Sequence, residues 1–201
     1  MHPFHDALLA AIADVYRAEE DPEGPRVANA LLSTPQPTAV GPEAPCALDA
    51  MIRACLAGSD HSVAQATLAA MDVLPWGANP VGAQMTEEAA AICAVLTLLD
   101  PAGPIPSPDQ RLGLLYQRPN SYYPLHTHDA DETYVIVAGR ALWTAGEDTR
   151  DRGPGEAIHH PSRMPHAFRT GPEGMVALWR WSGDINAESY AFIEETVPLT
   201  A

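Results

Sequence analysis

Two histidines, a glutamate and a tyrosine lie close together in the second half of the 201-residue chain. His126 and His128 are two residues apart, Glu132 follows after a short acidic turn, and Tyr134 lies two residues beyond Glu132. Alternate residues of a β-strand project from the same face, so each of these two pairs can project together from its own strand. If the turn at 129–131 folds one strand back on the other, three metal-ligating groups and a phenol converge on one point.

A later segment supplies one more metal-ligating group. Residues 155–166 have the pattern of a strand, a turn and a second strand, and His166 begins the second strand. A histidine within a strand is usually structural or exposed, but five of the eight histidines of the chain lie between residues 126 and 166. We therefore predict one divalent transition metal ion, bound by His126, His128, Glu132 and His166. Such a mixed set of nitrogen and oxygen ligands suits Zn, Fe, Mn, Ni or Co and does not choose among them. Our own preference is Zn or Fe.

The first segment resembles a motif of the cupin superfamily, G-x5-H-x-H-x3,4-E-x6-G. The chain fits this motif at His126, His128, Glu132 and Gly139, whereas Asn120 replaces the first glycine. All the ligand positions of the motif are therefore present.

The second segment resembles the other cupin motif, G-x5-P-x-G-x2-H-x3-N. Gly155, Pro161 and His166 fit it, whereas Arg163 stands where glycine is usual and Thr170 where asparagine is usual. The resemblance implies a small antiparallel β-barrel, or jelly roll, with a metal ion bound inside it. It does not imply one particular reaction, because the cupin fold carries many chemistries.

Tyr134 alternates with Glu132 and should face the interior of such a barrel. It is then either a core tyrosine that makes one hydrogen bond or a catalytic group. A phenol has a pKa of about 10 and is a poor base at neutral pH, but an adjacent divalent cation favours the phenolate and lowers this pKa. A metal ion that also holds a substrate carboxylate would make the α-proton of that acid more acidic. The metal would then act as a Lewis acid and template, and Tyr134 as the general base.

A narrower resemblance rests on the order of the site residues along the chain: a histidine, then Glu-x-Tyr, then the histidine of the second motif. The chain also has the size of a small cupin and a helical first half. This order is similar to that of the bacterial cupin-type dimethylsulfoniopropionate (DMSP) lyases, most of all the Q type. The resemblance implies that a metal-bound tyrosine, here Tyr134, removes the α-proton of DMSP, and that β-elimination yields dimethyl sulfide and acrylate. It implies His128, Glu132 and His166 as metal ligands, with His126 either as the fourth ligand or as a pocket residue.

The implied substrate is a zwitterion with a sulfonium at one end and a carboxylate at the other, and onium groups favour aromatic faces. The resemblance implies Tyr123 and Trp181 as pocket aromatics. Trp179 shares a strand face with Trp181, so both point into the barrel or both cover the helical half. We also assign His160 to the pocket, although a position behind the ligands or at the surface is the more ordinary one. The predicted substrate-binding residues are Tyr122, Tyr123, Trp179, Trp181 and His160.

Three other functions remain open. The chain could be a different metal-dependent cupin enzyme, such as a dioxygenase or an isomerase, with Tyr134 as an acid or a bystander. It could be a lyase-like protein that acts on another β-substituted acid. It could also be a cupin that binds a small ligand without turnover.

The composition limits the classes of molecule that the protein can be expected to bind. The formal net charge is −15, which argues against nucleic acid and anionic membrane surfaces. All eleven basic residues are arginine, which excludes Schiff-base chemistry by lysine. Three cysteines without CxxC spacing, no visible secretory signal and no long apolar run predict a cytoplasmic protein. We expect a small zwitterionic carboxylate as substrate, and a homodimer is left open.

Local patterns predict the elements that must position the site. Helical spacing of apolar residues predicts helices at 4–18, 26–32, 46–56, 60–74 and 86–99, with Asp60 or Ser62 capping the fourth and Thr86 the fifth. A Pro-rich stretch at 101–108 then ends the helical pattern. Short strands follow at 114–117, 132–138, 140–145, 156–159, 164–170 and 175–181, and 186–195 looks like a closing helix.

The predicted fold class is therefore mainly β with α. A helical N-terminal region, residues 1–108, would pack on a single cupin barrel, residues 109–201, that ends in a C-terminal helix.

Overall fold

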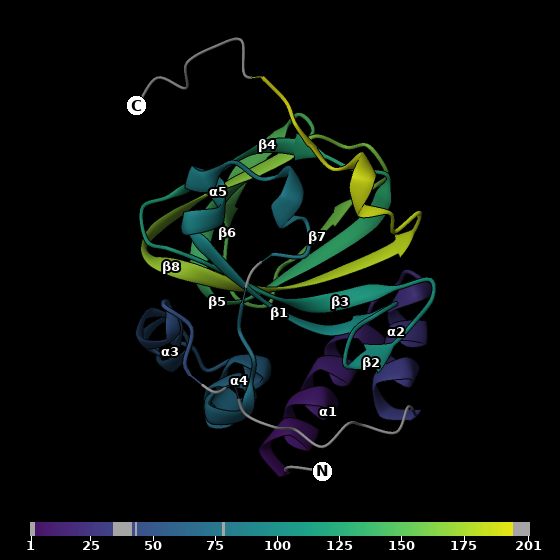
Figure 1. Cartoon of the computed structure of the whole chain (residues 1–201), viewed down its shortest axis with the longest axis vertical. Helices are drawn as coiled ribbons and strands as arrows, with labels where there is room; N and C mark the ends of the chain where they lie inside the picture. The colour runs from purple at the N-terminus through teal and green to yellow at the C-terminus, as the bar shows by residue number, and fades with distance from the viewer. Residues whose placement is uncertain (1–2, 34–41, 43, 78, 195–201) are drawn as a thin grey trace.

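A sheet that curls into a barrel forms one half of the molecule, and α-helices cover one side of it (Figure 1). The computed structural model describes residues 3–33, 42, 44–77 and 79–194. The α-helices are α1 (Pro3–Arg17), α2 (Glu23–Ser33), α3 (Asp49–Ala57), α4 (Ser62–Ala70) and the short α5 (Glu87–Ala91). The strands are β1 (Cys93–Asp100), β2 (Ile105–Pro106), β3 (Arg111–Gln117), β4 (Tyr122–Thr127), β5 (Ala130–Ala145), β6 (Asp148–Arg152), β7 (Ala157–His160), β8 (His166–Gly183) and β9 (Ala191–Phe192).

Two long strands organise the sheet. The order of neighbours is β2-β1-β3-β8-β4-β9, and β5 pairs with β6, β7 and β8. Strands β5 and β8 are antiparallel along nearly their whole length, from the pair Ala130–Gly183 to the pair Ala145–His166. Strand β5 also pairs with β6 and β7, and β8 also pairs with β3 and β4, so the sheet closes around an interior. This arrangement confirms the predicted antiparallel barrel.

A close approach of β5 to β8 explains the last glycine of the first cupin motif. Gly139 has a φ of +70°, and a Cβ atom placed there would lie 2.0 Å from the carbonyl oxygen of Gly174. Only glycine fits such a position without moving the backbone. The pairing of the two strands changes register beside Gly139, as at a β-bulge.

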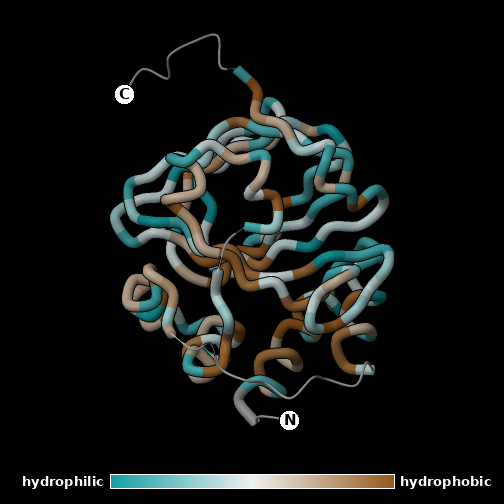
Figure 2. Tube along the Cα trace, viewed as in Figure 1, coloured by the Kyte–Doolittle hydropathy of each residue, from teal (hydrophilic) through white to brown (hydrophobic). Residues whose placement is uncertain are grey.

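Both faces of the central strands are buried. In β5, Val135 and Val137 pack against the helices, whereas Tyr134 and Ile136 belong to the cluster that fills the barrel. Figure 2 shows the hydrophobic stretches of the helices lying next to the hydrophobic centre of the sheet. Strand residues therefore alternate between two apolar clusters rather than between a core and solvent.

The predicted helices of the first 74 residues are confirmed in position, with shifted ends. Helix α2 begins at Glu23 rather than Arg26, and α3 begins at Asp49 rather than Cys46. The N-cap of α4 is His61, whose ring nitrogen accepts a hydrogen bond from the Val63 amide, so neither predicted cap serves this helix. Among the described residues, no helix is long and apolar enough to cross a membrane.

The helix predicted from Thr86 through Leu99 is wrong beyond Ala91. Thr86 is the N-cap as expected, and its hydroxyl accepts from the Ala89 amide. Cys93–Asp100 is strand β1, however, and the sheet thus begins well before residue 108. A strand buried on both faces is a continuous apolar run, and such a run lacks the alternation that separates a strand from a helix.

The closing helix predicted at 186–195 is also wrong within the described residues. A single 3-10 turn, η3 (Ala187–Ser189), is followed by strand β9, which pairs with β4. Tyr190 and Phe192 therefore have strand spacing. The strands predicted at 164–170 and 175–181 are one strand, β8, which is continuous through the connecting residues.

The two residues that replace motif glycines keep a glycine-like backbone. Asn120 has a φ of +51° and Arg163 a φ of +67°. Thr170, which replaces the usual asparagine, donates its hydroxyl proton to the Arg118 carbonyl and accepts from the Ser121 amide. The departures from the cupin motifs thus preserve the turns that the motifs describe.

An ion pair ties the end of α1 to the outer face of the barrel. The fully buried guanidinium of Arg180 donates to both carboxylate oxygens of Glu19, at 2.7 and 3.1 Å. The Thr133 hydroxyl donates to the same carboxylate, at 2.7 Å. Because Thr133 follows Glu132, this network lies on the opposite side of β5 from the predicted ligand.

We expect Glu19→Gln to lower the free energy of unfolding by about 3 kcal/mol, because it leaves the buried Arg180 charge without its counter-ion. The matched control is Asp14→Asn, which removes an ion pair with Arg17 whose side chains are 76% and 49% exposed. That change should cost less than about 1 kcal/mol. Urea unfolding followed by circular dichroism measures both, and equal losses in the two variants would contradict the assignment.

Candidate metal centre

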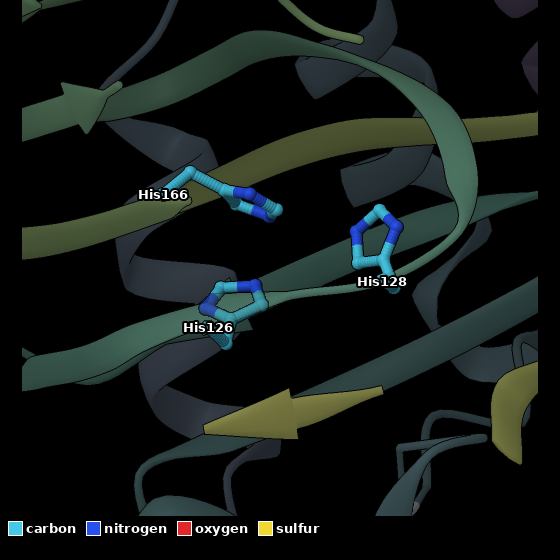
Figure 3. A group of neighbouring side chains, drawn as sticks. All are labelled: His126, His128 and His166. Atoms are coloured by element: carbon cyan, nitrogen blue, oxygen red, sulfur yellow. The ribbon is translucent and has the colours of Figure 1, made fainter. Parts of the chain in front are cut away.

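The strand register brings the four predicted metal ligands together. His126 of β4 is directly opposite His166 of β8, and His128 follows β4 in the turn to β5. The three imidazole rings point toward one another inside the barrel (Figure 3). Glu132 of β5 approaches the same point, with one carboxylate oxygen, Oε2, 3.1 Å from His128 Nε2 and 3.2 Å from His166 Nε2.

Backbone carbonyls fix the protonation of these imidazoles. Nδ1 lies 2.8 Å from the Pro124 oxygen in His126, 3.1 Å from the Ala130 oxygen in His128 and 2.9 Å from the Met164 oxygen in His166. A carbonyl oxygen only accepts hydrogen bonds, so each Nδ1 carries a proton, and in the neutral form of the ring the lone pair is on Nε2. Histidines that bind metals in proteins are held in this way.

The Nε2 lone pairs of the three imidazoles and the Glu132 carboxylate converge on one point, and such a group of acceptors requires a positive species between them. His126, His128 and His166 are all buried, and their ligand atoms lie within 4.8 Å of one another. His166 Nε2 has no hydrogen-bond partner in the described structure and faces a carboxylate oxygen. Two acceptors at this distance repel unless a proton or a metal ion lies between them. The residues therefore fit a bound divalent cation, and the donor set is the mixed nitrogen and oxygen set of transition metals.

The environment keeps the carboxylate charged and one imidazole neutral. Burial alone would raise the pKa of Glu132, but the proximity of His128 and of the other buried imidazoles holds this pKa well below its usual value. The Trp181 indole also donates to Glu132 Oε1, at 2.7 Å. Burial, followed by the proximity of His166, holds the pKa of His126 well below its usual value. Both groups are thus in the forms that bind a metal ion.

An aromatic pocket adjoins this centre. Tyr123, Tyr134, Trp179 and Trp181 line it, so both tryptophans point into the barrel. The free space that it encloses is about 30 Å³, which is room for about two water molecules.

Two predicted pocket residues do not line it. Tyr122 alternates with Tyr123, and the Arg169 guanidinium lies over its ring, 4.5 Å from the ring centroid. His160 is fully buried behind Glu132 instead of in the pocket, because it is the cross-strand neighbour of Glu132 in β7.

Sequence reasoning missed three polar residues that line the pocket. Tyr190 donates a hydrogen bond to the Tyr123 hydroxyl, at 2.8 Å, and its ring stacks on His126. Asn79 and Arg111 also line the pocket, and the buried Nε of Arg111 has no hydrogen-bond partner in the described structure. Only the strand register, which places Arg111 opposite Trp181, would have located the arginine.

The barrel and the buried histidines on its inner face define the chain as a cupin whose centre could hold a metal ion. A family model for DMSP lyase matches residues 26–177. The chain therefore belongs to the DMSP lyase family.

Two curated proteins are similar to the chain. One is the DMSP lyase DddQ of Ruegeria pomeroyi, with 34% identity over 125 residues, which is 62% of each chain. The other is the putative DMSP lyase DddL of Cereibacter sphaeroides, with 33% identity over 92 residues, 45% of this chain and 38% of the relative. The matched part is less than two thirds of the length of either relative.

Two solved structures have the same fold. The crystal structure of DddQ from Ruegeria pomeroyi superposes with a TM-score of 0.69 and 26% identity, over 92% of this chain and 94% of that one. A structure from the work on the DMSP lyases RdDddP and RnDddQII gives a TM-score of 0.72 at 23% identity, over 96% and 98% of the two chains. The second likeness concerns the fold alone. Both cover nearly the whole chain, so the helices belong to the shared architecture.

We expect His166→Ala to lose nearly all bound metal, because it removes a ligand that lies between Glu132 and His126. The matched control is His159→Ala, since the His159 side chain is 48% exposed and pairs with Asp131 instead of the buried carboxylate. Elemental analysis of the purified variants measures the metal per chain. Full metal content in the His166 variant would remove this residue from the ligand set.

Proposed function

We propose that this protein is a metal-dependent lyase that cleaves DMSP to dimethyl sulfide and acrylate. The observation that carries the proposal is the group of three carbonyl-bound imidazoles and a charged carboxylate beside the pocket residue Tyr134. Membership of the DMSP lyase family supports the choice of substrate. The free thiols of Cys46, Cys55 and Cys93 support a cytoplasmic, reducing location, and the homodimer stays a prediction.

His126, His128, Glu132 and His166 would hold the metal ion, for which Zn or Fe is our choice. When bound, this ion supplies a Lewis acid that can hold a carboxylate and stabilise negative charge next to it.

Tyr134 is the proposed general base. Its hydroxyl group is buried, and this burial, together with the charge of Glu132, raises its pKa well above the usual value. The phenol alone would therefore stay protonated at neutral pH, and only a cation at the centre would make the phenolate accessible. The base and the cation site thus depend on each other.

The reaction needs one proton acceptor and no external oxidant. The Tyr134 phenolate oxygen takes the α-proton of DMSP, and the electron pair of the broken C–H bond forms the double bond between the α- and β-carbons. The bond between the β-carbon and sulfur breaks, and its electron pair leaves on sulfur as neutral dimethyl sulfide. Acrylate remains, and the proton on Tyr134 must pass to water before the next cycle.

The pocket offers a partner for each end of the zwitterion. The faces of Trp179 and Trp181 suit a sulfonium, which is attracted to aromatic rings as other onium groups are. The Nε–H of Arg111 offers a donor to a carboxylate.

The open alternatives give different products. A dioxygenase would consume oxygen in step with substrate, whereas the elimination consumes none. A lyase for another β-substituted acid would act on that acid with a higher kcat/KM than on DMSP and would release a leaving group other than dimethyl sulfide. A binding protein would hold DMSP or a related acid at equilibrium without forming acrylate.

We expect Tyr134→Phe to lower the rate of dimethyl sulfide release by about 10² to 10⁴, because the general base is lost. Its metal content should equal that of the unmodified protein, since Tyr134 lies outside the ligand set. Headspace gas chromatography, with and without chelator, measures the activity, and elemental analysis the metal.

Tyr116→Phe is the matched control. Tyr116 is also fully buried, but it packs between the helices and the sheet, and its hydroxyl has no hydrogen-bond partner in the described structure. Removing that hydroxyl should leave dimethyl sulfide release unchanged. If Tyr134→Phe releases dimethyl sulfide as fast as Tyr116→Phe does, Tyr134 is not the base.

A further inference from the structure

His160 lies between an indole and the buried carboxylate, and none of the proposed chemistry uses it. Its side chain is fully buried, and its Nε2 accepts a hydrogen bond from Trp143 Nε1, at 3.0 Å. Its other nitrogen, Nδ1, lies 3.5 Å from Glu132 Oε2. The cross-strand pairing of Glu132 with His160 in β5 and β7 creates this contact.

The indole settles which nitrogen of His160 carries the proton. A tryptophan N–H is only a donor, so the Nε2 atom that it contacts has no proton. The neutral ring must then carry its proton on Nδ1, the nitrogen that faces Glu132. His126, His128 and His166 have the same tautomer, but there Nδ1 faces a backbone carbonyl and the Nε2 lone pair faces the centre. His160 is thus turned the other way and presents a proton.

This orientation separates His160 from the ligands although it lies near them. Ligand atoms of Glu132, His160 and His166 also lie within 4.8 Å of one another. The rings of His160 and His166 are stacked, with centroids 4.0 Å apart and planes at 14°. Coordination through Nδ1 of a neutral His160 would require the proton to sit on Nε2, where it would collide with the indole N–H of Trp143.

We propose, on the basis of the proposed metal site, that His160 is a positioning residue that orients the Glu132 carboxylate through Nδ1–H, with its tautomer fixed by Trp143. Nδ1 has no hydrogen bond of ordinary geometry, and Glu132 Oε2 is the acceptor that it faces. A buried N–H without a partner is costly, so a shift of the carboxylate by a few tenths of an ångström completes the bond. Trp181 already holds the other oxygen, Oε1, at 2.7 Å. The two donors together fix the carboxylate plane.

Two substitutions of His160 test this role. His160→Asn keeps an N–H donor near the place of Nδ1, whereas His160→Leu keeps a similar volume and removes the donor. We expect His160→Leu to weaken Zn²⁺ binding by about 10- to 100-fold, the usual effect of losing a partner behind a metal ligand, and His160→Asn by less than about threefold. Competition with a chelating dye measures the affinity. His159→Asn and His159→Leu are the matched controls, because that neighbouring side chain is exposed, and neither should change it.

Substitution with Co²⁺ distinguishes positioning from coordination. The visible absorption of bound Co²⁺ reports the number and kind of its ligands, so it should keep its shape in both His160 variants. A changed spectrum, or a loss of affinity in His160→Asn as large as that in His160→Leu, would overturn the proposal. Thermal unfolding by circular dichroism identifies a variant that has simply failed to fold.

Trp143→Phe tests the tautomer directly. It keeps an aromatic ring in the stack and removes the donor, so His160 is free to place its proton on either nitrogen. The imidazole nitrogen signals in NMR should show Nδ1–H in the unmodified protein and a changed proton position in Trp143→Phe. Trp76→Phe is the control, because Trp76 is buried in the other apolar cluster and its Nε1 has no hydrogen-bond partner in the described structure.

The outcomes separate this proposal from the proposed function. If the unmodified protein binds no divalent metal, the proposed function fails, while the NMR signals still report the pairing of Trp143 with His160. If the unmodified protein binds Zn²⁺ and shows His160 with its proton on Nε2, this inference alone fails.

Discussion

The Glu132 carboxylate is a charged group with 1% of its surface exposed, inside a barrel otherwise filled with aromatic and aliphatic side chains. A buried charge is tolerated only when it is paired or bound by donors. Here the donors come from the sides: the Trp181 indole and, in our proposal, the Nδ1–H of His160. The Oε2 atom of the carboxylate also lies close to Nε2 of His128 and of His166. In the neutral rings these nitrogens are acceptors, as the carboxylate is. The centre is therefore balanced only when it holds a proton or a metal ion, and this requirement, more than the count of histidines, is the reason that it could hold a metal ion.

The position of Glu132 depends on the strand register on both sides of β5. Glu132 meets its partners because β5 is in register with β7 on one side and β8 on the other. A slip of one residue would turn the carboxylate to the outer face and bring Thr133 inside. The outer face resists such a slip, because Thr133 is tied to the ion pair of Glu19 with Arg180 under the helices. The helical layer thus contributes to the site without touching it.

The sequence predicted what depends on local spacing. The alternation of His126 with His128, and of Glu132 with Tyr134, follows from strand geometry, so the ligands could be located without knowing the fold. Strand β1 could not be recognised, since a strand covered on both faces loses its alternation and looks like a helix. Tyr190 was missed because its segment joins the barrel by pairing with β4, which is distant in sequence. His160 was assigned to the pocket for a related reason: its neighbours Trp143 and Glu132 are distant in sequence and meet only in the folded sheet.

Two residues that depart from the cupin motifs keep the backbone conformation of the glycines that they replace. A motif glycine marks a left-handed turn, and Asn120 and Arg163 still adopt one. Asparagine tolerates that conformation, but for arginine it costs about 1–2 kcal/mol. Beside the candidate metal centre, the Arg163 guanidinium pairs with Asp129 and the Arg163 amide donates to the carbonyl of His128. The turn that carries the strain is thus joined to the turn that carries a ligand. Replacing the glycine with arginine therefore gives up backbone freedom and adds one contact, the ion pair with Asp129, next to His128. The amide hydrogen bond to the His128 carbonyl would form with glycine as well.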